Sequence, residues 1–453
     1  MSRIWSRARL RGAAQAILRE ALLAAEPQRL VRRHLRLRNG ALEVAGVRHT
    51  LRRGRLVVVA AGKAAFAMAR AAEEVLGPHL TDGLAVSNSV QGTLERVRPL
   101  IASHPIPDAR GLAAAGETEA LARSLGKDDL LLVLLSGGAS ALLPAPANGV
   151  TLEDKARTTS LLLRAGATIH EMNAVRKHLS RLKGGGLARA AAPARVVTLV
   201  LSDVVGDDLS TIASGPTVAD LTTFTDALDV LHRRGVFADV PAAVRARLEA
   251  GARGEVEETP KRGDPVLGKA VTRVVGSNRI SIEAAARAAR REGLRPLVLT
   301  TRLEGEAREV ARVLVAVLRE CVSSGRPAPP PVALLAGGET TVTVRGDGQG
   351  GRNQELATAA AGALAGFPVP AVVASLGTDG IDGASDAAGG IVDDETLARA
   401  AHLGLAPPAA FIAASDTRNF LGPLGDLIVT GPTGTNVVDV VALLAGAPPA
   451  RGL

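Results

Sequence analysis

Short runs of apolar residues recur along the chain, each followed by glycine and then by apolar positions at helical spacing. The runs are apolar throughout, which is typical of strands that are buried on both faces, most often in parallel sheets. Strands that alternate with helices predict layered α/β domains joined by right-handed crossovers. The six runs lie at 56–60, 130–135, 196–201, 296–299, 332–335 and 371–376.

Polar and proline-rich stretches divide this pattern. A chain of 453 residues predicts two or three domains. Residues 248–265 are polar, with glycine and proline, and are interpreted as an exposed linker, so we divide the chain into 1–258 and 259–453. Residues 325–331 (GRPAPPP) predict a rigid loop inside the second domain. The longest uncharged stretch, 356–376, predicts a helix, a proline turn and a strand rather than a membrane span. We therefore expect a soluble, cytoplasmic protein without a membrane partner.

The positive charge of the chain is concentrated near its N-terminus. The formal charge is +9, but residues 1–55 alone contain 14 arginines against three acidic residues. The remaining residues therefore carry only −2. The apolar face of the predicted first helix consists of Leu10, Ile17, Leu18 and Leu22. We expect its arginines to form a solvated face, and the alternative is a nucleic-acid site that includes residues 1–9.

Composition excludes several classes of site. The chain has no Tyr, one Trp and six Phe, which leaves almost nothing to stack on nucleic-acid bases. Its single cysteine, Cys321, excludes an intramolecular disulfide framework and a cysteine-based zinc site. No G-x-G-x-x-G follows a strand and no G-x-S-x-G is present, so neither a nicotinamide site nor a serine hydrolase is indicated.

Two predicted strand ends carry residues suited to phosphate binding. Lys63 follows the first apolar run at the start of a predicted helix, where free N–H groups and a cation favour an anion. Gly137 and Gly138 follow the second run, and glycines let backbone amides approach a phosphate closely. Ser140 adds a hydrogen-bond donor. The alternatives are an exposed lysine and an ordinary tight turn.

The next two motifs carry charge of opposite sign. Arg176 and Lys177 belong to a basic cluster on a short predicted helix, and such a cluster can clamp a carboxylate or a phosphate. Asp203 and Asp207 follow a buried strand, and Mg²⁺ prefers one or two carboxylates together with phosphate oxygens. The alternatives are a solvated basic face and loop carboxylates without a ligand.

A glycine-rich stretch in the second half ends in Arg352 and Asn353 at a predicted helix start. The preceding strand ends at Gly338 and Glu339, and GDGQGG forms a flexible loop. Arg352 is placed to neutralise charge on a transferring phosphoryl group. Strand ends that supply amides, cations and carboxylates together favour a transferase that uses ATP and Mg²⁺ on a small substrate.

Several motifs, in order, resemble the glycerate 2-kinase family: SGGASALL, NAVRKHLSRLKGG, SDVVGDDLSTIASGPT, GGETTVTVRGDGQGGRNQELA, TDGIDGASDAAG and TGPTGTNVVDV. The resemblance covers about residues 10–445. It implies a Rossmann-like N-terminal glycerate kinase domain, a smaller α/β C-terminal MOFRL domain, and an active site in the cleft between them. It implies transfer of the γ-phosphoryl group of ATP to the 2-hydroxyl of D-glycerate, and it places the catalytic roles on Lys63 and Arg352.

The predicted site therefore consists of four groups of residues. Lys63 and Arg352 flank the transferring group. Gly137, Gly138, Ser140, Gly338 and Glu339 are the candidates for nucleotide binding. Asp203 and Asp207 are the candidates for Mg²⁺, and Arg176, Lys177 and Asn353 are those for substrate. The rival function is that of a hydroxypyruvate reductase, a label often given to relatives. We expect a monomer or a homodimer that binds ATP and D-glycerate and no nucleic acid.

Overall fold

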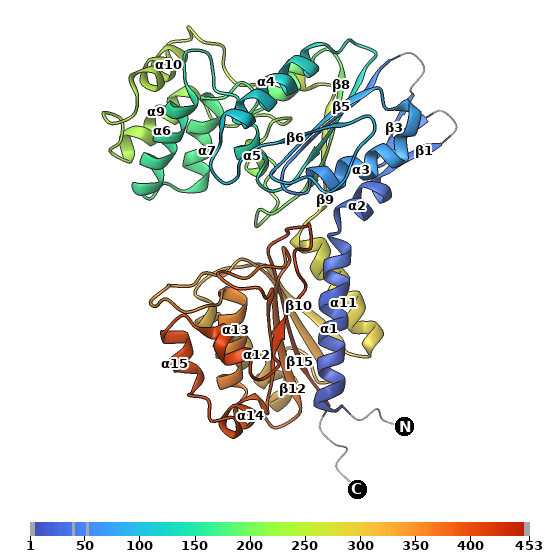
Figure 1. Ribbon diagram of the computed structural model, residues 1–453, viewed down its shortest axis with the longest axis vertical. Helices are drawn as coiled ribbons and strands as arrows, with labels where there is room; N and C mark the ends of the chain where they lie inside the picture. Colours follow the sequence, from blue (N-terminus) through green and yellow to red (C-terminus); the bar gives the residue numbers. More distant parts are fainter. Residues whose placement is uncertain (1–4, 39–40, 51–53, 448–453) are drawn as a thin grey trace. The chain divides into compact units, whose positions relative to one another are not determined.

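The computed structural model describes residues 5–38, 41–50 and 54–447, and these form two compact units (Figure 1). The middle unit is Pro27–Val275. The terminal unit joins Met1–Glu26 to Gly276–Leu453, so it contains both ends of the chain. Both units are α/β, as the alternation of strands and helices predicts.

A six-stranded sheet with the order β6-β5-β4-β7-β8-β9 is the centre of the middle unit. The pairs β6–β5, β5–β4, β4–β7 and β7–β8 are all parallel, which confirms the mostly parallel sheet expected here. Every residue of β4 and of β7 is buried, because helices cover both faces of such a sheet. The strands are β4 (Leu56–Ala61), β5 (Asp82–Ser87), β6 (Arg98–Ile101), β7 (Leu130–Leu135), β8 (Arg195–Leu201) and β9 (Ala270–Gly276).

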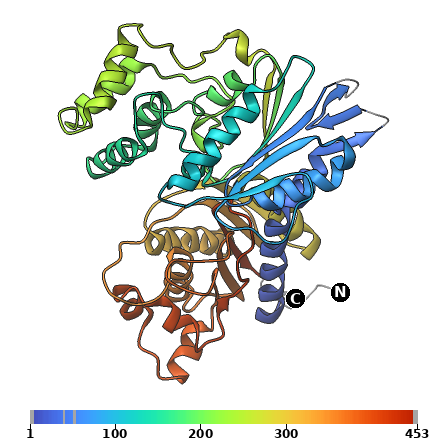
Figure 2. The same ribbon diagram turned by 45° about the horizontal axis from the view of Figure 1, so that its top comes forward.

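Helices of the middle unit follow the strands and also form a separate group. The helices that contact the sheet are α3 (Ala65–Leu76), α4 (Ala109–Arg123), α5 (Ala139–Leu142) and α8 (Gly186–Ala191), and α2 (Pro27–His34) packs on α3. The separate group consists of α6 (Leu152–Arg164), α7 (Ile169–His178), α9 (Phe224–Arg233) and α10 (Ala242–Ala252). Figure 2 shows this group, in green, on the side of the unit away from the blue strands.

Local sequence explains where the helices of that group begin. Thr151, Thr168 and Thr223 each accept a hydrogen bond from the third helical residue, and an acidic side chain at that position bonds back to the threonine. These are three capping boxes, which satisfy the otherwise unpaired N–H groups of a first turn. The group buries its own apolar core around Phe224 and Leu231.

Short elements complete the middle unit. An antiparallel sheet consists of β1 (Leu35–Arg38), β2 (Ala41–Val44) and β3 (Val47–Thr50). Three 3₁₀ turns lie at η1 (Gly77–His79), η2 (Ile212–Ser214) and η3 (Pro265–Leu267).

The terminal unit has a mixed sheet with the order β10-β11-β15-β12-β13-β14. Among the described strand pairs of this sheet only β10–β11 is parallel, and β12 is antiparallel to both of its neighbours. The interpretation of run 371–376 as a parallel strand was therefore wrong. Burial on both faces makes a strand apolar throughout, whatever its direction. The strands are β10 (Arg295–Leu303), β11 (Val332–Gly338), β12 (Ala371–Gly377), β13 (Gly389–Asp393), β14 (Leu427–Ile428) and β15 (Asp439–Ala445).

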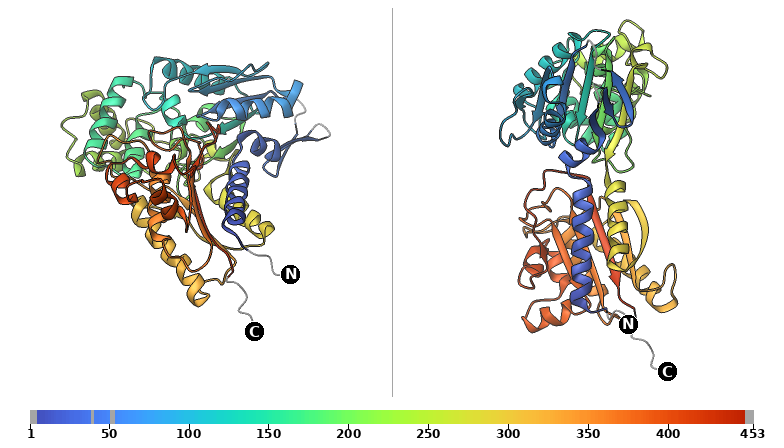
Figure 3. Two further views of the ribbon diagram at one scale, coloured as in Figure 1. Left: turned by 60° about the horizontal axis from the view of Figure 1, so that its bottom comes forward. Right: turned by 90° about the vertical axis from the view of Figure 1, so that its right-hand side faces the viewer.

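Two helical layers cover this sheet, and alternate strand residues point to each layer. Leu334 and Val373 pack on the side of α12 and α13, whereas Leu335 and Val372 pack on the side of α1 and α11. Figure 3 shows α1, in blue, beside α11 along the sheet. The helices are α1 (Arg7–Ala24), α11 (Asn278–Glu292), α12 (Ala307–Ser324), α13 (Arg352–Ala363), α14 (Thr396–His402), α15 (Pro408–Ala413) and α16 (Thr417–Leu421).

Helix α1 packs within the terminal unit and not within Pro27–Val275. Leu10, Ile17 and Leu18 are buried there, as the apolar pattern predicts. The expectation that its arginines are all solvated was wrong. Arg7 pairs with Asp394 at 2.7 Å, and Arg11 bridges acidic residues of the same unit. These internal ion pairs neutralise part of the positive charge of the N-terminal segment.

The chain leaves the middle unit at Val275, near the end of β9, whereas we divided it near residue 259. Residues between α10 and β9 stay with the middle unit because β9 extends its sheet. The proline-rich residues 325–331 connect α12 to β11 inside the terminal unit, as predicted. No helix in the described part of the chain combines the length and the apolarity that a membrane crossing requires.

Candidate functional site

The carboxyl ends of β4, β7 and β8 lie side by side in the middle unit, and the turns after them contact one another. The Lys63 N–H donates to the Gly137 carbonyl at 2.8 Å, and the Ala64 N–H donates to Ser136 Oγ at 3.0 Å. Lys63 itself is exposed, at the start of α3. Ligands of parallel α/β sheets bind at this edge. Lys63 therefore lies at the carboxyl edge of the sheet, after the strand that the sequence predicts to precede it.

Two glycines of the turn after β7 make room for side chains from neighbouring strands. A Cβ atom at Gly137 would lie 2.1 Å from Asp203 Oδ2. At Gly138, whose φ is +85°, it would lie 3.0 Å from His104 Nε2 and 3.4 Å from Lys63 Cγ. Glycine is therefore required because the side chains of Asp203, His104 and Lys63 converge above this turn.

Asp203 is the acidic member of this convergence. Burial raises the pKa of its carboxyl, and the charge of Lys63 opposes that rise. Within the described residues no other side chain hydrogen-bonds to this carboxylate. Asp207 lies in the following turn with a φ of +58°. The carboxylate of the neighbouring Asp208 accepts hydrogen bonds from the hydroxyls of Ser210 and Thr211. No group of three or more His, Cys, Asp or Glu side chains forms a metal centre in the described chain. Asp203 fits a metal that takes one or two carboxylates and completes its shell with phosphate oxygens and water.

Ser140 lies on α5, directly behind the glycine turn, and is the centre of a cationic cluster. Its hydroxyl is 2.8 Å from Arg176 Nη2, 2.9 Å from Lys183 Nζ and 3.0 Å from Ser214 Oγ. Both cations donate to the hydroxyl oxygen. The side chain predicted to bind phosphate is therefore held in place by protein groups, and Arg176 is brought to the same turn.

The cluster has an excess of positive charge. Lys155, whose Nζ donates to the Pro144 carbonyl at 2.5 Å, lies close enough for Arg176 to lower its pKa. Burial is the larger cause and lowers the pKa of Lys155 to about 7. Burial also lowers the pKa of Lys183 far below its ordinary value. The nearby Asn173 has a buried Nδ2 without a hydrogen-bond partner. Such a group of donors is chemically suited to an anion.

Lys177 is adjacent to Arg176 in sequence but lies in a different environment. Its Nζ pairs with Asp220 Oδ1 at 3.1 Å, and both side chains are almost fully buried. His178 bonds to Glu258 Oε1 at 2.9 Å in the same network. The structure therefore brings Arg176, and not Lys177, to the glycine turn.

Arg352 begins α13 in the terminal unit and is surrounded by carboxylates. Its Nε and Nη2 donate to Asp439 at 2.6 and 3.0 Å, and Nη1 is 3.0 Å from Glu339 Oε1. Burial works against its charge, but the hydrogen bond and the charge of Asp439 outweigh burial and raise the pKa of Arg352. The guanidinium is therefore a permanent cation held in a fixed direction.

Asn353 and Asp382 organise the start of the same helix. Asp382 accepts hydrogen bonds from the N–H groups of Asn353 and Gln354 at 3.0 and 2.8 Å, which caps α13. Asn353 Nδ2 donates to Asp439 at 3.0 Å, and Asn353 Oδ1 accepts from Ser375 at 2.6 Å. Asn353 is buried, so in this structure its polar atoms orient Asp439 and through it Arg352.

Gly338 has a structural reason to be glycine. Its φ is +146°, and a Cβ atom there would lie 2.2 Å from the backbone N of Leu303 on the neighbouring strand. Glu339, the next residue, pairs with Arg352. Glu339 lines a pocket of about 660 Å³, and Gly338 precedes it in the chain. The same pocket is lined by Arg352, Glu355, Asp379 and Asp382. The pocket contains both cationic and anionic groups next to the predicted catalytic arginine.

The structure adds residues that the sequence did not single out as site residues. His104 follows β6, and burial, with a further contribution from Lys63, lowers its pKa. Asp382 and Asp439 stand in two motifs of the family resemblance, TDGIDGASDAAG and TGPTGTNVVDV, and Lys183 stands in a third, NAVRKHLSRLKGG. The sequence predicts no role for these three residues. The signal for each was a polar residue next to a buried strand or to a glycine turn.

Comparisons with known proteins agree with this arrangement. A family model described as "Domain of unknown function (DUF4147)" matches residues 13–249, and the model of the MOFRL family matches residues 332–439. A glycerate 2-kinase of Pyrococcus horikoshii is 42% identical over 424 residues, which cover 93% of this chain and 94% of that relative. The chain belongs to the glycerate 2-kinase family. Its two domains, the DUF4147 domain and the MOFRL domain, are thus the ones that the resemblance implied.

Two further comparisons extend the family assignment. The crystal structure of a glycerate kinase from Thermotoga maritima has a TM-score of 0.86 and 38% identity, covering 96% of this chain and 99% of that chain. A protein of Agrobacterium vitis with the provisional name hydroxypyruvate reductase is 46% identical over 397 residues, covering 87% of this chain and 88% of that protein. Members of the glycerate 2-kinase family therefore carry both names.

Proposed function

We propose that the protein is an ATP-dependent kinase that phosphorylates the 2-hydroxyl of D-glycerate and yields 2-phosphoglycerate. Family membership over nearly the whole chain carries the proposal. The cations and the carboxylate at the strand ends support it, because phosphoryl transfer depends on positioning and charge neutralisation more than on covalent chemistry.

Lys63 and Arg352 act on the transferring phosphoryl group. Lys63 is an exposed cation beside the glycine turn, and Arg352 is a fixed cation whose charge Asp439 secures. Charge that spreads over the equatorial oxygens in the transition state is stabilised by cations already in position. The backbone amides around Gly137 and Gly138 bind nucleotide phosphates, and Gly338 and Glu339 shape the pocket beside Arg352.

Asp203, at the carboxyl edge of the middle sheet, would hold Mg²⁺, with Asp207 as the second acidic group. The ion would supply positive charge that offsets part of the charge of the phosphate oxygens. The raised pKa of Asp203 reflects its burial, and a bound cation would favour its ionised form.

The carboxylate of glycerate binds to the cationic cluster behind the glycine turn. Arg176 is the residue that recognises it, since Lys177 is already paired with a buried carboxylate. Ser140, between Arg176 and Lys183, fixes the position of that guanidinium. His104, kept neutral by burial, lies beside the turn and is available to accept a hydrogen bond from a substrate hydroxyl.

Turnover of ATP with D-glycerate tests the proposal, with a product assay that separates 2-phosphoglycerate from 3-phosphoglycerate. K63A and R352A should each lower kcat by about 10²–10³, the effect of losing one charge-stabilising group. K127A and R287A, at exposed positions of the two units, are the matched controls and should keep wild-type kcat. Wild-type kcat in both K63A and R352A would contradict the roles, and 3-phosphoglycerate alone would contradict the regiochemistry.

The second candidate function is reduction of hydroxypyruvate, which the name of the Agrobacterium relative favours. It requires a nicotinamide cofactor. The one G-x-G-x-x-G match, residues 346–351, is separated from the end of β11 by seven residues, so it is not the tight turn directly after a strand that binds a dinucleotide. NADH oxidation in the presence of hydroxypyruvate, without ATP, distinguishes the two functions. The kinase proposal predicts no oxidation above the rate without enzyme.

A further inference from the structure

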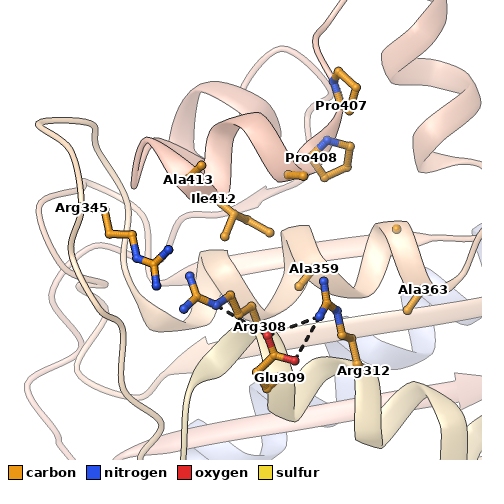
Figure 4. A pocket seen from close by; sticks show the side chains of 12 residues that line it. Arg308, Glu309, Arg312, Arg345, Ala359, Ala363, Pro407, Pro408, Ile412 and Ala413 are labelled. Carbon is orange, nitrogen blue, oxygen red and sulfur yellow. Dashed lines mark hydrogen bonds and ion pairs between the residues drawn. The ribbon is translucent and has the colours of Figure 1, made fainter.

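A second pocket of the terminal unit lies away from Arg352, among α12, α13 and α15. Its volume is about 700 Å³. One wall is apolar and is formed by Ala359 and Ala363 of α13 together with Pro408 and Ile412 at α15 (Figure 4). The opposite side carries three arginines, namely Arg308, Arg312 and Arg345. No part of the proposed glycerate kinase mechanism uses this pocket.

The arginines are only partly neutralised. Glu309 is the single acidic residue of the lining, and it pairs with Arg312 at 3.0 Å and with Arg308 at 3.7 Å. Behind the pocket Glu306 pairs with Arg308 at 3.2 Å. Arg345 forms no ion pair with any described residue. Glu355 of α13 lies close enough for Arg308 and Arg345 to lower the pKa of its carboxyl, although burial is the larger effect and raises that pKa. The residues that line the pocket itself, three arginines and one glutamate, keep a net positive charge beside an apolar wall.

The directions of the arginine side chains indicate which geometry of anion would fit between them. Figure 4 shows the guanidinium groups of Arg345 and Arg308 pointing toward one another, although like charges repel. Arg345 comes from the loop after β11, and Arg308 comes from the first turn of α12, so their donors enter the pocket from two elements. A tetrahedral oxyanion offers acceptors in several directions, whereas a carboxylate offers two oxygens in one plane.

We propose that this pocket binds a phosphate monoester that carries a small apolar group. Arg345 and Arg308 bind the phosphate, Arg312 adds charge at the rim, and Ile412 with the α13 alanines covers the apolar group. An organic ester is favoured over free phosphate because the pocket is much larger than one phosphate ion and half of its lining is apolar.

The position of the pocket connects it to the loop that precedes Arg352. Thr343 of that loop donates to Glu306 from its N–H at 2.9 Å, and Glu306 is the partner of Arg308. Glu355, one turn along α13 from Arg352, lies close enough for the charges of Arg308 and Arg345 to act on its carboxyl. A ligand on Arg308 and Arg345 would therefore bind to residues that interact with the loop before Arg352 and with the first turns of α13.

Arginine modification by phenylglyoxal, read peptide by peptide with mass spectrometry, tests the proposal on the unaltered full chain. Phenyl phosphate is the probe and inorganic phosphate is the comparison. At a probe concentration ten times the dissociation constant, the modification rates of Arg345 and Arg308 should fall about tenfold, because about a tenth of the sites stay free. Arg287, exposed on α11, is the internal control and should react at the same rate throughout.

The apolar wall is tested by I412Q, a substitution at a half-exposed position. It should weaken protection by phenyl phosphate and leave protection by inorganic phosphate unchanged. Unchanged rates at Arg345 with phenyl phosphate, or an equal fall at Arg287, would overturn the proposed site. Equal protection by the two probes in the wild type would overturn its assignment to an organic ester. None of these readouts depends on kinase activity, so they are independent of the proposed function.

Discussion

Arg176 and Lys177 are consecutive residues of α7, yet their side chains lie in different environments. Consecutive helical positions point about 100° apart, so neighbours on α7 face different surroundings. Arg176 reaches Ser140 beside the glycine turn, whereas Lys177 neutralises the buried Asp220. The basic cluster was visible in the sequence, but the choice between the two cations was not.

Substitution of each cation should therefore affect a different property. R176Q should raise the KM for D-glycerate about tenfold or more, since it removes a charge-assisted hydrogen bond to the substrate. K177M should leave that KM unchanged and lower the free energy of unfolding by about 3–5 kcal/mol, because Asp220 stays buried without its partner. Steady-state kinetics and urea unfolding measure the two effects. Recovery of stability in K177M/D220N is the control, and an unchanged KM in R176Q would contradict the assignment.

Lys155 should give the stability of the protein a particular pH dependence. Burial foremost, with Arg176 and Arg181, lowers its pKa from 10.5 to about 7 in the folded state. Between these values the unfolded chain binds more protons than the folded one, so the free energy of unfolding rises with pH. The rise should be about 1.4 kcal/mol per pH unit at most.

The comparison with K155M isolates this contribution. The difference in the free energy of unfolding, wild type minus K155M, should increase from pH 7 to pH 10 and stay constant below about pH 6. Urea unfolding at several pH values measures it. Parallel profiles of the two proteins would show that Lys155 keeps an ordinary pKa.

At the scale of elements, the site depends on turns that follow adjacent strands. The glycine turn after β7 is compact because Asp203, from the turn after β8, occupies the space that a Gly137 side chain would need. The glycines could be recognised in the sequence. The group that requires their small size could not, because 66 residues separate Gly137 from Asp203 and only the strand order brings them together.

G137A should therefore damage the site more than the fold. Its Cβ atom would lie 2.1 Å from Asp203 Oδ2, so the carboxylate must move. We expect kcat to fall on the order of 10²-fold, as for loss of a positioned charged group. G116A, on α4 where a Cβ atom meets nothing within 4 Å, is the matched control. It should keep wild-type kcat and gain about 0.5–1 kcal/mol of stability. Equal kcat in both variants would refute the contact.

Strand direction in the terminal unit was not available from the apolar pattern. Runs 56–60 and 371–376 look alike in sequence, yet β4 is parallel and β12 is antiparallel to its neighbours. Both strands are covered on their two faces, and burial alone determines the composition of a strand. The pairing partner depends on the path of the connections, which the composition of one strand does not record.

For the whole molecule, the first helix determines which segments form a folding unit. Arg11 on α1 lies 2.6 Å from Asp393 and 2.6 Å from Asp426, and Asp426 is almost fully buried. These pairs link residues more than 380 positions apart. The N-terminal segment is therefore a part of the terminal unit, although the sequence leads from it directly into the middle unit.

R11M should weaken the terminal unit by breaking this link. We expect the free energy of unfolding to fall by about 1–3 kcal/mol, because two buried carboxylates lose a hydrogen-bonded partner while Arg399 still pairs with them. R19Q, at an exposed position of the same helix, should change stability by less than about 0.5 kcal/mol. Thermal and urea unfolding measure both variants, and an equal effect of the two would contradict the anchoring role.

The sequence by itself determined the α/β class, six strand segments, the family, and Lys63 and Arg352 as the cations to examine. Five of the six segments are buried as predicted, but run 296–299 lies in β10, which is only partly buried, with Val298 exposed. These features follow from local patterns, since burial, turn chemistry and helix starts depend on residues close together in the chain. Tertiary structure alone decided that Arg176 and not Lys177 reaches the turn, that Asp439 holds Arg352, and that α1 belongs with the C-terminal segment. Each of these is a contact between residues far apart in sequence, and such contacts are set by strand order and packing, which no local pattern contains.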